Sequence, residues 1–499
     1  MTFLFASEAK MRTAWWCFLL VLGRASVYCC KDEMDCGANG ACTGGVCHCT
    51  APWVGPQCSN LALLPVDRGS SGYRPPSSSS WGGSILRGDG DGGDDGDGDG
   101  NSTTTTRHWM WASEMVGNCG LKAWTRNSRV VLAASAAGPA GPYAFVKELW
   151  PVFSHEPVAA RAPTGEYVVW FTSDAYGTAV GEAGGGAPCV PPCFDGGSAA
   201  GVHPGGRVCL GGCANGSSFV PGDGGHPACA DNRTIERSPL TRLPTVMSWA
   251  PHPLGPWSAP VVVYNGSDGS AGGAASGDTN FAGVILHDSS VLGLWRGVGA
   301  PGSAPPATAA NPRGAARMQY GARARHWRDA RSYAFGRAEA GRNVFPALAD
   351  GGGANCGGGI EDPTVWLDAR GRLHALVHNY AAGGHAASDD GGATWRWYGG
   401  TCSNGTADEP PGGPGAALPG AHDDAPAPRW CAGANCSAWG APVRFTGGDP
   451  PVELQQRERP HVVLGGADGR TVVALSTGVR EPDGQHDRTW TMVQSCDLR

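Results

Sequence analysis

In the third quarter of the chain, apolar and polar positions alternate in the pattern of two short strands joined by a turn. Residues 364–367 are β-branched, aromatic or aliphatic, and residues 373–378 alternate along a second strand. Between them, residues 368–371 read Asp-Ala-Arg-Gly, and the glycine supplies the positive φ of a tight turn. Glu361, Asp362 and Pro363 precede the first strand. The segment is predicted to be a β-hairpin with two acids at its entrance.

The same pattern occurs four more times along the chain. Five units, each too small to bury its own core, predict an all-β fold with a five-bladed β-propeller over residues 61–499. The units are unevenly spaced because of Gly-, Pro- and Cys-rich insertions at 88–106, 181–240, 299–316 and 401–439, which we expect to be loops. The other four units begin at Trp81, His155, Asp278 and Glu458, and their second strands are predicted at 108–115, 167–174, 291–298 and 471–479.

The composition agrees with a turn-rich β protein. The 499 residues include 80 glycines, 39 prolines and 19 tryptophans, and no stretch has a helical period of useful length. A formal net charge of −7 gives no reason to expect nucleic acid as a partner. Because an open ring would expose a sheet edge, we expect residues 61–66 to add a strand to the last blade and close the ring.

Residues 1–25 have the features of a cleaved signal peptide. Lys10 and Arg12 precede an apolar run at 14–22, which is shorter than the roughly 20 residues a transmembrane helix needs, and small residues follow it. A retained signal anchor is the alternative. We therefore expect a secreted or cell-surface protein, or one in the lumen of the secretory pathway. Six Asn-x-Ser/Thr sequons agree with a glycoprotein: Asn101, Asn215, Asn232, Asn265, Asn404 and Asn435.

Export also agrees with the cysteines, because removal of Cys17 with the signal leaves 18 of the 19. Cys-x3-Cys pairs in the 181–240 insertion suggest local disulfides, with a zinc site as the alternative. Six cysteines within residues 29–60, including the Cys47-His48-Cys49 sequence and the closing loop to Cys58, resemble an EGF-like module. The resemblance implies an extracellular protein partner for the module, no bound calcium, and the pairs Cys30–Cys42, Cys36–Cys47 and Cys49–Cys58.

The propeller segment resembles the family 43-like glycoside hydrolases and their relatives. The residues that carry this resemblance include Trp81-Gly82-Gly83-Ser84, Asp278-Thr279-Asn280, Glu361-Asp362-Pro363 and Arg457-Glu458-Arg459-Pro460-His461. Such enzymes imply a general base, a general acid and a third carboxylate at a central funnel. An inverting pair of carboxyl groups lies roughly 6.5–9.5 Å apart.

The first blade departs from the family pattern, since the family's base is an Asp at an entrance that here reads Trp81-Gly82-Gly83-Ser84. Asp278 and Glu114 are the alternative bases, and Glu361 and Asp362 match the proton donor and its neighbour. A Glu or Asp before proline can instead simply cap the backbone of the strand entrance. Eight residues are candidates for substrate binding, with core packing or structural hydrogen bonds as the other reading: Trp81, His155, Trp295, Arg296, His378, His385, Arg459 and His461.

Two hypotheses follow from these residues. The first is an exported, inverting glycosidase acting on a polysaccharide or cell-wall glycan, without a cofactor or a metal. The second is a non-catalytic glycan-binding or adhesion protein, which the absent entrance Asp and the EGF-like module favour. A further prediction is a Cys119–Cys356 disulfide across the mouth of the funnel, because both cysteines lie in glycine-containing loops apart from the other cysteine clusters.

Overall fold

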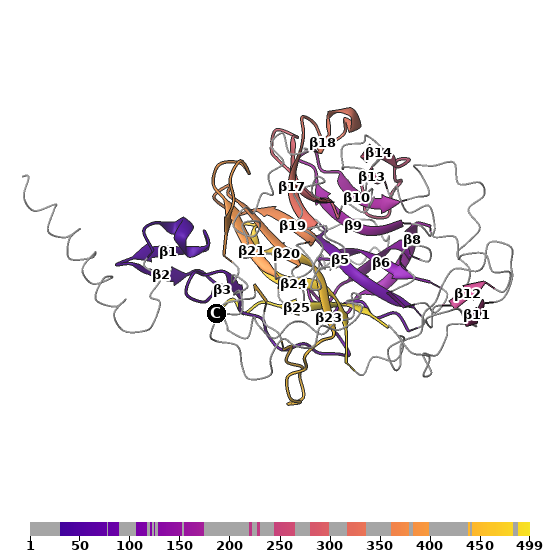
Figure 1. Cartoon of the computed structure of the whole chain (residues 1–499), viewed down its shortest axis with the longest axis horizontal. Helices are drawn as coiled ribbons and strands as arrows, with labels where there is room; N and C mark the ends of the chain where they lie inside the picture. Colours follow the sequence, from indigo (N-terminus) through magenta and orange to yellow (C-terminus); the bar gives the residue numbers. More distant parts are fainter. Residues whose placement is uncertain are drawn as a thin grey trace, which may run out of the picture.

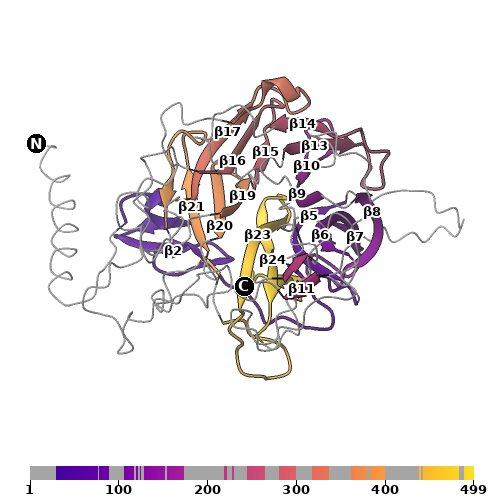
Figure 2. The same ribbon diagram turned by 45° about the vertical axis from the view of Figure 1, so that its right-hand side comes forward.

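The computed structural model shows five antiparallel sheets arranged around a common centre, as Figure 1 and Figure 2 show, which confirms the predicted five-bladed propeller. Contacts between the first strands of the five sheets form a closed cycle, β5–β9–β15–β19–β23–β5. No helix in the part of the chain described is long and apolar enough to cross a membrane. The structure describes residues 30–76, 78–88, 106–116, 120–121, 124, 128–151, 154–173, 219–221, 227–229, 244–264, 280–298, 317–335, 361–378, 383–398, 438–439, 442–482 and 488–499.

Four blades have four described strands and the fifth has three. Blade 1 consists of β5 (Ser79–Arg87), β6 (His108–Met115), β7 (Ser128–Ser135) and β8 (Ala144–Trp150). Blade 2 consists of β9 (Ser154–Arg161), β10 (Tyr167–Ser173), β13 (Thr245–Ala250) and β14 (Val261–Tyr264). Blade 3 consists of β15 (Ala282–Ile285), β16 (Val291–Val298), β17 (Arg317–Ala324) and β18 (Ala334–Phe335). Blade 4 consists of β19 (Glu361–Leu367), β20 (Leu373–His378), β21 (Gly384–Ser388) and β22 (Arg396–Trp397), and blade 5 of β23 (Gln456–Gly465), β24 (Thr471–Arg480) and β25 (Trp490–Ser495).

The core lies between neighbouring blades. Every residue of the middle strands β6 and β10 is buried, because each face of these strands is covered by an adjacent sheet. Trp111 and Trp170 are fully buried in two such layers, one between blades 1 and 2 and the other between blades 2 and 3. Apolar area buried in this way contributes about 25 cal/mol per Å², so packing between neighbouring blades stabilises the ring.

The N-terminal end of the propeller segment runs beside the last strand, as expected for ring closure. Leu63 pairs with Cys496 and Tyr73 pairs with Thr491, both as isolated antiparallel bridges rather than as a continuous strand. Tyr73 and Thr491 exchange backbone hydrogen bonds of 2.8 and 3.2 Å. The first and last parts of the ring are therefore joined by backbone pairing.

The EGF-like module contains η1 (Glu33–Cys36), β1 (Gly40–Thr43), β2 (Val46–Cys49), β3 (Trp53–Val54) and β4 (Asn60–Leu61). Its three disulfides are Cys30–Cys42, Cys36–Cys47 and Cys49–Cys58, which is the pairing implied by the resemblance. Outside the described residues lie the predicted signal peptide, the six sequons, Asp278, and the two cysteines of the predicted Cys119–Cys356 disulfide.

Substitution of Gly72 tests the ring closure. A Cβ at Gly72 would lie 2.0 Å from the backbone oxygen of Thr491, so Gly72→Ala is expected to lower the free energy of unfolding by about 3 kcal/mol or more. Gly371 has a similar φ, +78° against +74°, but open space around its Cβ position. Gly371→Ala is the control, with an expected cost of about 1–2 kcal/mol from the left-handed backbone alone. Equal losses in denaturant unfolding of the two variants would contradict closure at this position.

Candidate functional site

Five residues with left-handed backbone form a ring, one at the entrance of each blade. Their φ angles lie between 43° and 60°, and at all but the third blade a register shift interrupts the first strand pair of the blade. Each is a β-bulge or strand-entrance bend that redirects one side chain relative to the pleat. Proline follows three of the five, at points where the strand pairing is already interrupted and a missing N–H donor costs little. The five residues are Gly82, Glu156, Asn280, Asp362 and Arg459.

The side chains of four of these residues meet in one network. Nη1 of Arg459 lies 2.5 Å from Oε1 of Glu156 and 3.3 Å from Oδ1 of Asp362, and Asn280 donates a hydrogen bond to Oε2 of Glu156. All four residues are buried, so water screens the charges weakly. The two carboxylate oxygens are at most 2.5 plus 3.3, or 5.8 Å, apart. Arg459 therefore links blades 2, 4 and 5.

Gly82, the fifth member of the ring, leaves room for that arginine. A Cβ at Gly82 would lie 2.9 Å from Cβ and 3.0 Å from Nε of Arg459. Even the smallest side chain at this position would therefore displace Arg459 or its neighbours. Blade 1 thus supplies space to the network, where the other four blades supply a side chain.

A second, more accessible group surrounds His378. Its Nδ1 lies 3.9 Å from Oε1 of Glu361 and 3.7 Å from Oδ2 of Asp362, and its Nε2 lies 3.7 Å from Oε1 of Glu458. Arg296 donates a charge-assisted hydrogen bond to Glu361. The side chains of Glu361 and Glu458 are 16% and 22% exposed, so these two carboxylates are more accessible than those bonded to Arg459.

Asp362, His378 and Glu458 could together hold a cation, since one ligand atom from each lies within 4.8 Å of the others. The guanidinium of Arg459 already bonds Asp362 and places a positive charge beside this position. A cation would therefore compete with Arg459 for the same carboxylate.

Trp124 is a candidate that the sequence analysis missed. Its ring stacks on His155, with centroids 4.9 Å apart and planes 25° apart, and the residue is only partly buried. His155 shares a 2.6 Å hydrogen bond with Ser128, and its Nε2 lies 3.8 Å from Glu156. Trp124 follows β6 and is not part of any alternating pattern. The only sequence signal for it was a tryptophan shortly after a strand that was predicted to end at the funnel.

Two of the predicted substrate-binding residues pack in buried aromatic clusters. Trp295 packs between Tyr264 and Phe335, at centroid distances of 5.5 and 5.8 Å. His385 is buried beneath Trp53 of the EGF-like module, 4.8 Å between ring centroids. The alternation of apolar and polar residues along a strand could not distinguish an interblade core from the axial site, because both faces of a blade are buried.

Glu114 is bonded elsewhere rather than grouped with Glu156 and Asp362. Arg129 donates to it over 2.6 Å, and Tyr73 donates a second hydrogen bond. Burial and the Glu114 carboxylate raise the pKa of Tyr73, so the phenol keeps its proton and remains a donor. These contacts give Glu114 a structural role near the ring closure.

Trp81 and His461 are buried close to the network but offer little to a ligand. A Cβ at Gly478 would lie 2.6 Å from the Trp81 ring, which shows how tightly blade 1 packs against blade 5 there. Burial, and to a lesser extent Arg459, lowers the pKa of His461 to about 3. His461 is therefore neutral at physiological pH. Burial also lowers the pKa of Arg457 to about 9, and this residue donates a 2.9 Å hydrogen bond to Gln494.

Comparison with known proteins gives only distant likenesses. No protein-family model matches the chain, and no curated protein matches it. A protein of unknown function from Dyadobacter fermentans has 10% identity and a TM-score of 0.41, over 88% of this chain and 99% of that one. The α-L-arabinofuranosidase PaAbf62A from Podospora anserina has 10% identity and a TM-score of 0.39, over 88% and 98%. A thermostable family-43 glycoside hydrolase has 8% identity and a TM-score of 0.39, over 87% and 92%.

The class defined by the structure itself is a five-bladed β-propeller with an N-terminal EGF-like module and a charged axial network. These similarities are too distant to support a conclusion about the site. Its chemistry follows from its own geometry.

Three buried histidines predict a pH-dependent stability. Burial lowers the pKa of His374, His385 and His461, so the folded chain resists protonation that the unfolded chain accepts below about pH 6.5. This contribution to the free energy of unfolding is therefore fully present above that pH. It is lost as the pH falls toward the folded-state pKa values, by about 1.4 kcal/mol per pH unit for each histidine.

Chemical denaturation between pH 7.5 and 5 measures this slope. His461→Gln is expected to remove about one third of it, while substitution of the exposed His48 by Asn is expected to leave it unchanged. A free energy of unfolding that stays constant from pH 7 to pH 5 would contradict the burial of neutral histidines.

Proposed function

We propose that the protein binds a carbohydrate at the axial site, and that this site recognises a glycan rather than hydrolysing it. The observation that carries the proposal is the position of Arg459, which occupies the space left by Gly82 and bonds Glu156 and Asp362. Three disulfides in the module agree with a function in the secretory pathway or outside the cell.

The spacing of the axial carboxylates argues against inverting hydrolysis by this pair. An inverting pair needs room for a water molecule and lies roughly 6.5–9.5 Å apart. The nearest described oxygens of Glu156 and Asp362 are at most 5.8 Å apart, the sum of their distances to Arg459, and the guanidinium stands between them. Both carboxylates accept charge-assisted hydrogen bonds from it, so neither is poised to activate water or to donate a proton.

The more accessible group provides what sugar recognition needs. Glu361 and Glu458 can accept hydrogen bonds from hydroxyl groups, and Arg296 can donate them. The partly exposed ring of Trp124, which stacks on His155 beside Glu156, offers an aromatic surface of the kind that stacks on a pyranose or furanose.

Inverting hydrolysis is the second candidate, and the accessibility of Glu361 favours it. This carboxylate is 16% exposed, next to Arg296 and His378, and could serve as the general acid. This alternative requires Asp278 as the base. Asp278 precedes Asn280, the entrance residue of blade 3, by two positions in the sequence.

Binding is tested with the full chain, purified after secretion, on an array of plant, algal and microbial glycans. Trp124→Ala is expected to weaken the selected glycan about tenfold, because loss of an aromatic stacking contact costs about 1–1.5 kcal/mol. Glu361→Gln is expected to weaken it by a similar factor. The control is Glu166→Gln, which alters another arginine-paired glutamate. Glu166 bonds Arg328 and lies in the turn between β9 and β10, at the end of that hairpin opposite Glu156. Binding that both site variants leave intact would contradict the assignment.

Hydrolysis is tested with aryl glycosides and with polysaccharides that the array identifies. The wild-type chain is expected to bind without turnover, and product release is measured by reducing-sugar assay and chromatography. Turnover that Glu361→Gln abolishes, with glycan affinity retained, would replace the recognition proposal with the hydrolase.

A further inference from the structure

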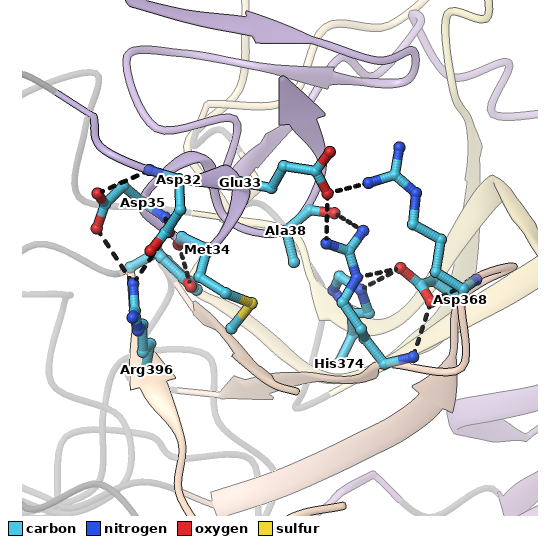
Figure 3. A network of polar contacts seen from close by, with 11 residues as sticks. Asp32, Glu33, Met34, Asp35, Ala38, Asp368, His374 and Arg396 are labelled. Atoms are coloured by element: carbon cyan, nitrogen blue, oxygen red, sulfur yellow. Dashed lines mark hydrogen bonds and ion pairs between the residues drawn. The ribbon is translucent and has the colours of Figure 1, made fainter. Parts of the chain in front are cut away.

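The acidic turn of the EGF-like module contacts blade 4 through arginines, as Figure 3 shows. Arg396 lies 3.1 Å from Asp35 and 3.5 Å from Asp32, and Arg370 bonds Glu33. All of these side chains are at least one-third exposed, and exposed ion pairs contribute little to stability. These pairs orient the module but do not account for its attachment.

Arg372 makes the stronger polar contact, since its side chain is only 14% exposed. It donates to Oε2 of Glu33 over 3.1 Å and to the backbone oxygen of Ala38 over 2.6 Å, both in the module. Its Nε donates to Asp368 over 2.9 Å, within the turn that joins β19 to β20. One guanidinium therefore fastens the module to the turn of this hairpin.

Apolar residues complete the attachment. Trp53 of the module stacks on Trp366 of β19, with planes 7° apart, and lies 4.8 Å from the His385 ring. The Tyr398 hydroxyl donates to the backbone oxygen of Met34 over 2.5 Å. The buried cluster around Trp53 includes cysteines of the module and residues of blades 4 and 5, so module and propeller share one core.

The hairpin β19–β20 connects this interface with the axial site. Its turn carries Asp368 and Arg372, and its opposite end carries Glu361, Asp362 and His378. Within the hairpin, His374 stacks on Trp366, shares a 3.0 Å hydrogen bond with His385 and lies 3.4 Å from Asp368. Burial opposes the charge on Asp368, but hydrogen bonds from His374 and the Arg372 backbone outweigh it and hold the pKa well below its usual range.

The outer strand of blade 4 also contacts the module. This strand, β22, has only two residues, Arg396 and Trp397, and Arg396 is the residue that bonds the module. A two-residue edge strand adds little stability to a sheet. The module therefore contacts the short outer strand of blade 4.

We propose that the EGF-like module is a positioning element for the axial site. It holds the β19–β20 hairpin through Glu33–Arg372 at the turn and through Trp53 on its face, and so fixes the end that carries Glu361, Asp362 and His378. This role does not depend on which ligand the axial site binds. In the folded chain, the acidic residues of the module's turn are therefore paired with arginines of blade 4.

Hydrogen–deuterium exchange of the full chain tests this role. Trp53→Ala is expected to accelerate exchange about tenfold or more along 361–378, and Glu33→Gln by a smaller factor, including the amides of Val365 and His378 beyond the turn, with no change in 79–87 or 154–161. Trp53→Phe keeps an aromatic ring at the interface and is expected to restore most of the protection. Glu166→Gln, which breaks an ion pair with Arg328 instead, is the control and is expected to leave 361–378 unchanged.

Two results would overturn the proposal. Faster exchange confined to the module and to residues 368–372 would show that the attachment does not extend to the axial end of the hairpin. Equal acceleration in all five blades would show that the module adds only general stability. Because Glu33→Gln is isosteric, it provides a folded variant even if Trp53→Ala does not fold.

Discussion

The buried guanidinium of Arg459 is the interaction on which the axial architecture depends. A propeller brings five strand entrances together at its axis, and any acids there repel one another unless a cation lies among them. From blade 5, Arg459 supplies that cation to Asp362 in the neighbouring blade 4 and to Glu156 across the ring in blade 2. Removing one member of such a network would leave a buried charge uncompensated, which typically costs about 3–5 kcal/mol. The network is thus both a structural bond between blades and the feature that defines the chemistry of the axis.

The backbone makes this network possible. A left-handed φ in a residue other than glycine or asparagine costs about 1–2 kcal/mol, and Glu156, Asp362 and Arg459 all adopt it. The packing of five blades imposes these bends and the ion pairs offset their cost. At Gly82 the absence of a side chain is what matters, since it accommodates Arg459. A change at one blade entrance is therefore felt at the others.

Much of the fold could be predicted from the sequence, because strand alternation and turn residues are local signals. The repeated entrances, the five blades and the closure beside residues 61–66 all depend on such signals, whereas the disulfide pairs were implied by the resemblance to an EGF-like module. The contact between Gly82 and Arg459 could not be predicted in this way, since it joins opposite ends of the propeller segment through a bulge that no local pattern specifies. The packing of Trp295 and His385 in aromatic clusters could not be predicted for a related reason, because an apolar or aromatic position in a blade fits an interblade core as well as the axis.

The module and the axis are two parts of one arrangement, joined by the hairpin of blade 4. A module of about thirty residues has too little core to stand firmly alone and relies on its disulfides and on the surface it covers. Blade 4 has a short outer strand, and the module packs against apolar residues of this blade. The axial network and the attachment of the module therefore follow from the same packing.

A crystal structure of the full chain tests the central claim most directly. The account predicts the Arg459 guanidinium within about 3 Å of carboxylate oxygens of both Glu156 and Asp362, with its side chain packed against Gly82. An Arg459 side chain turned away from the ring, with Glu156 and Asp362 facing each other across ordered water, would contradict it.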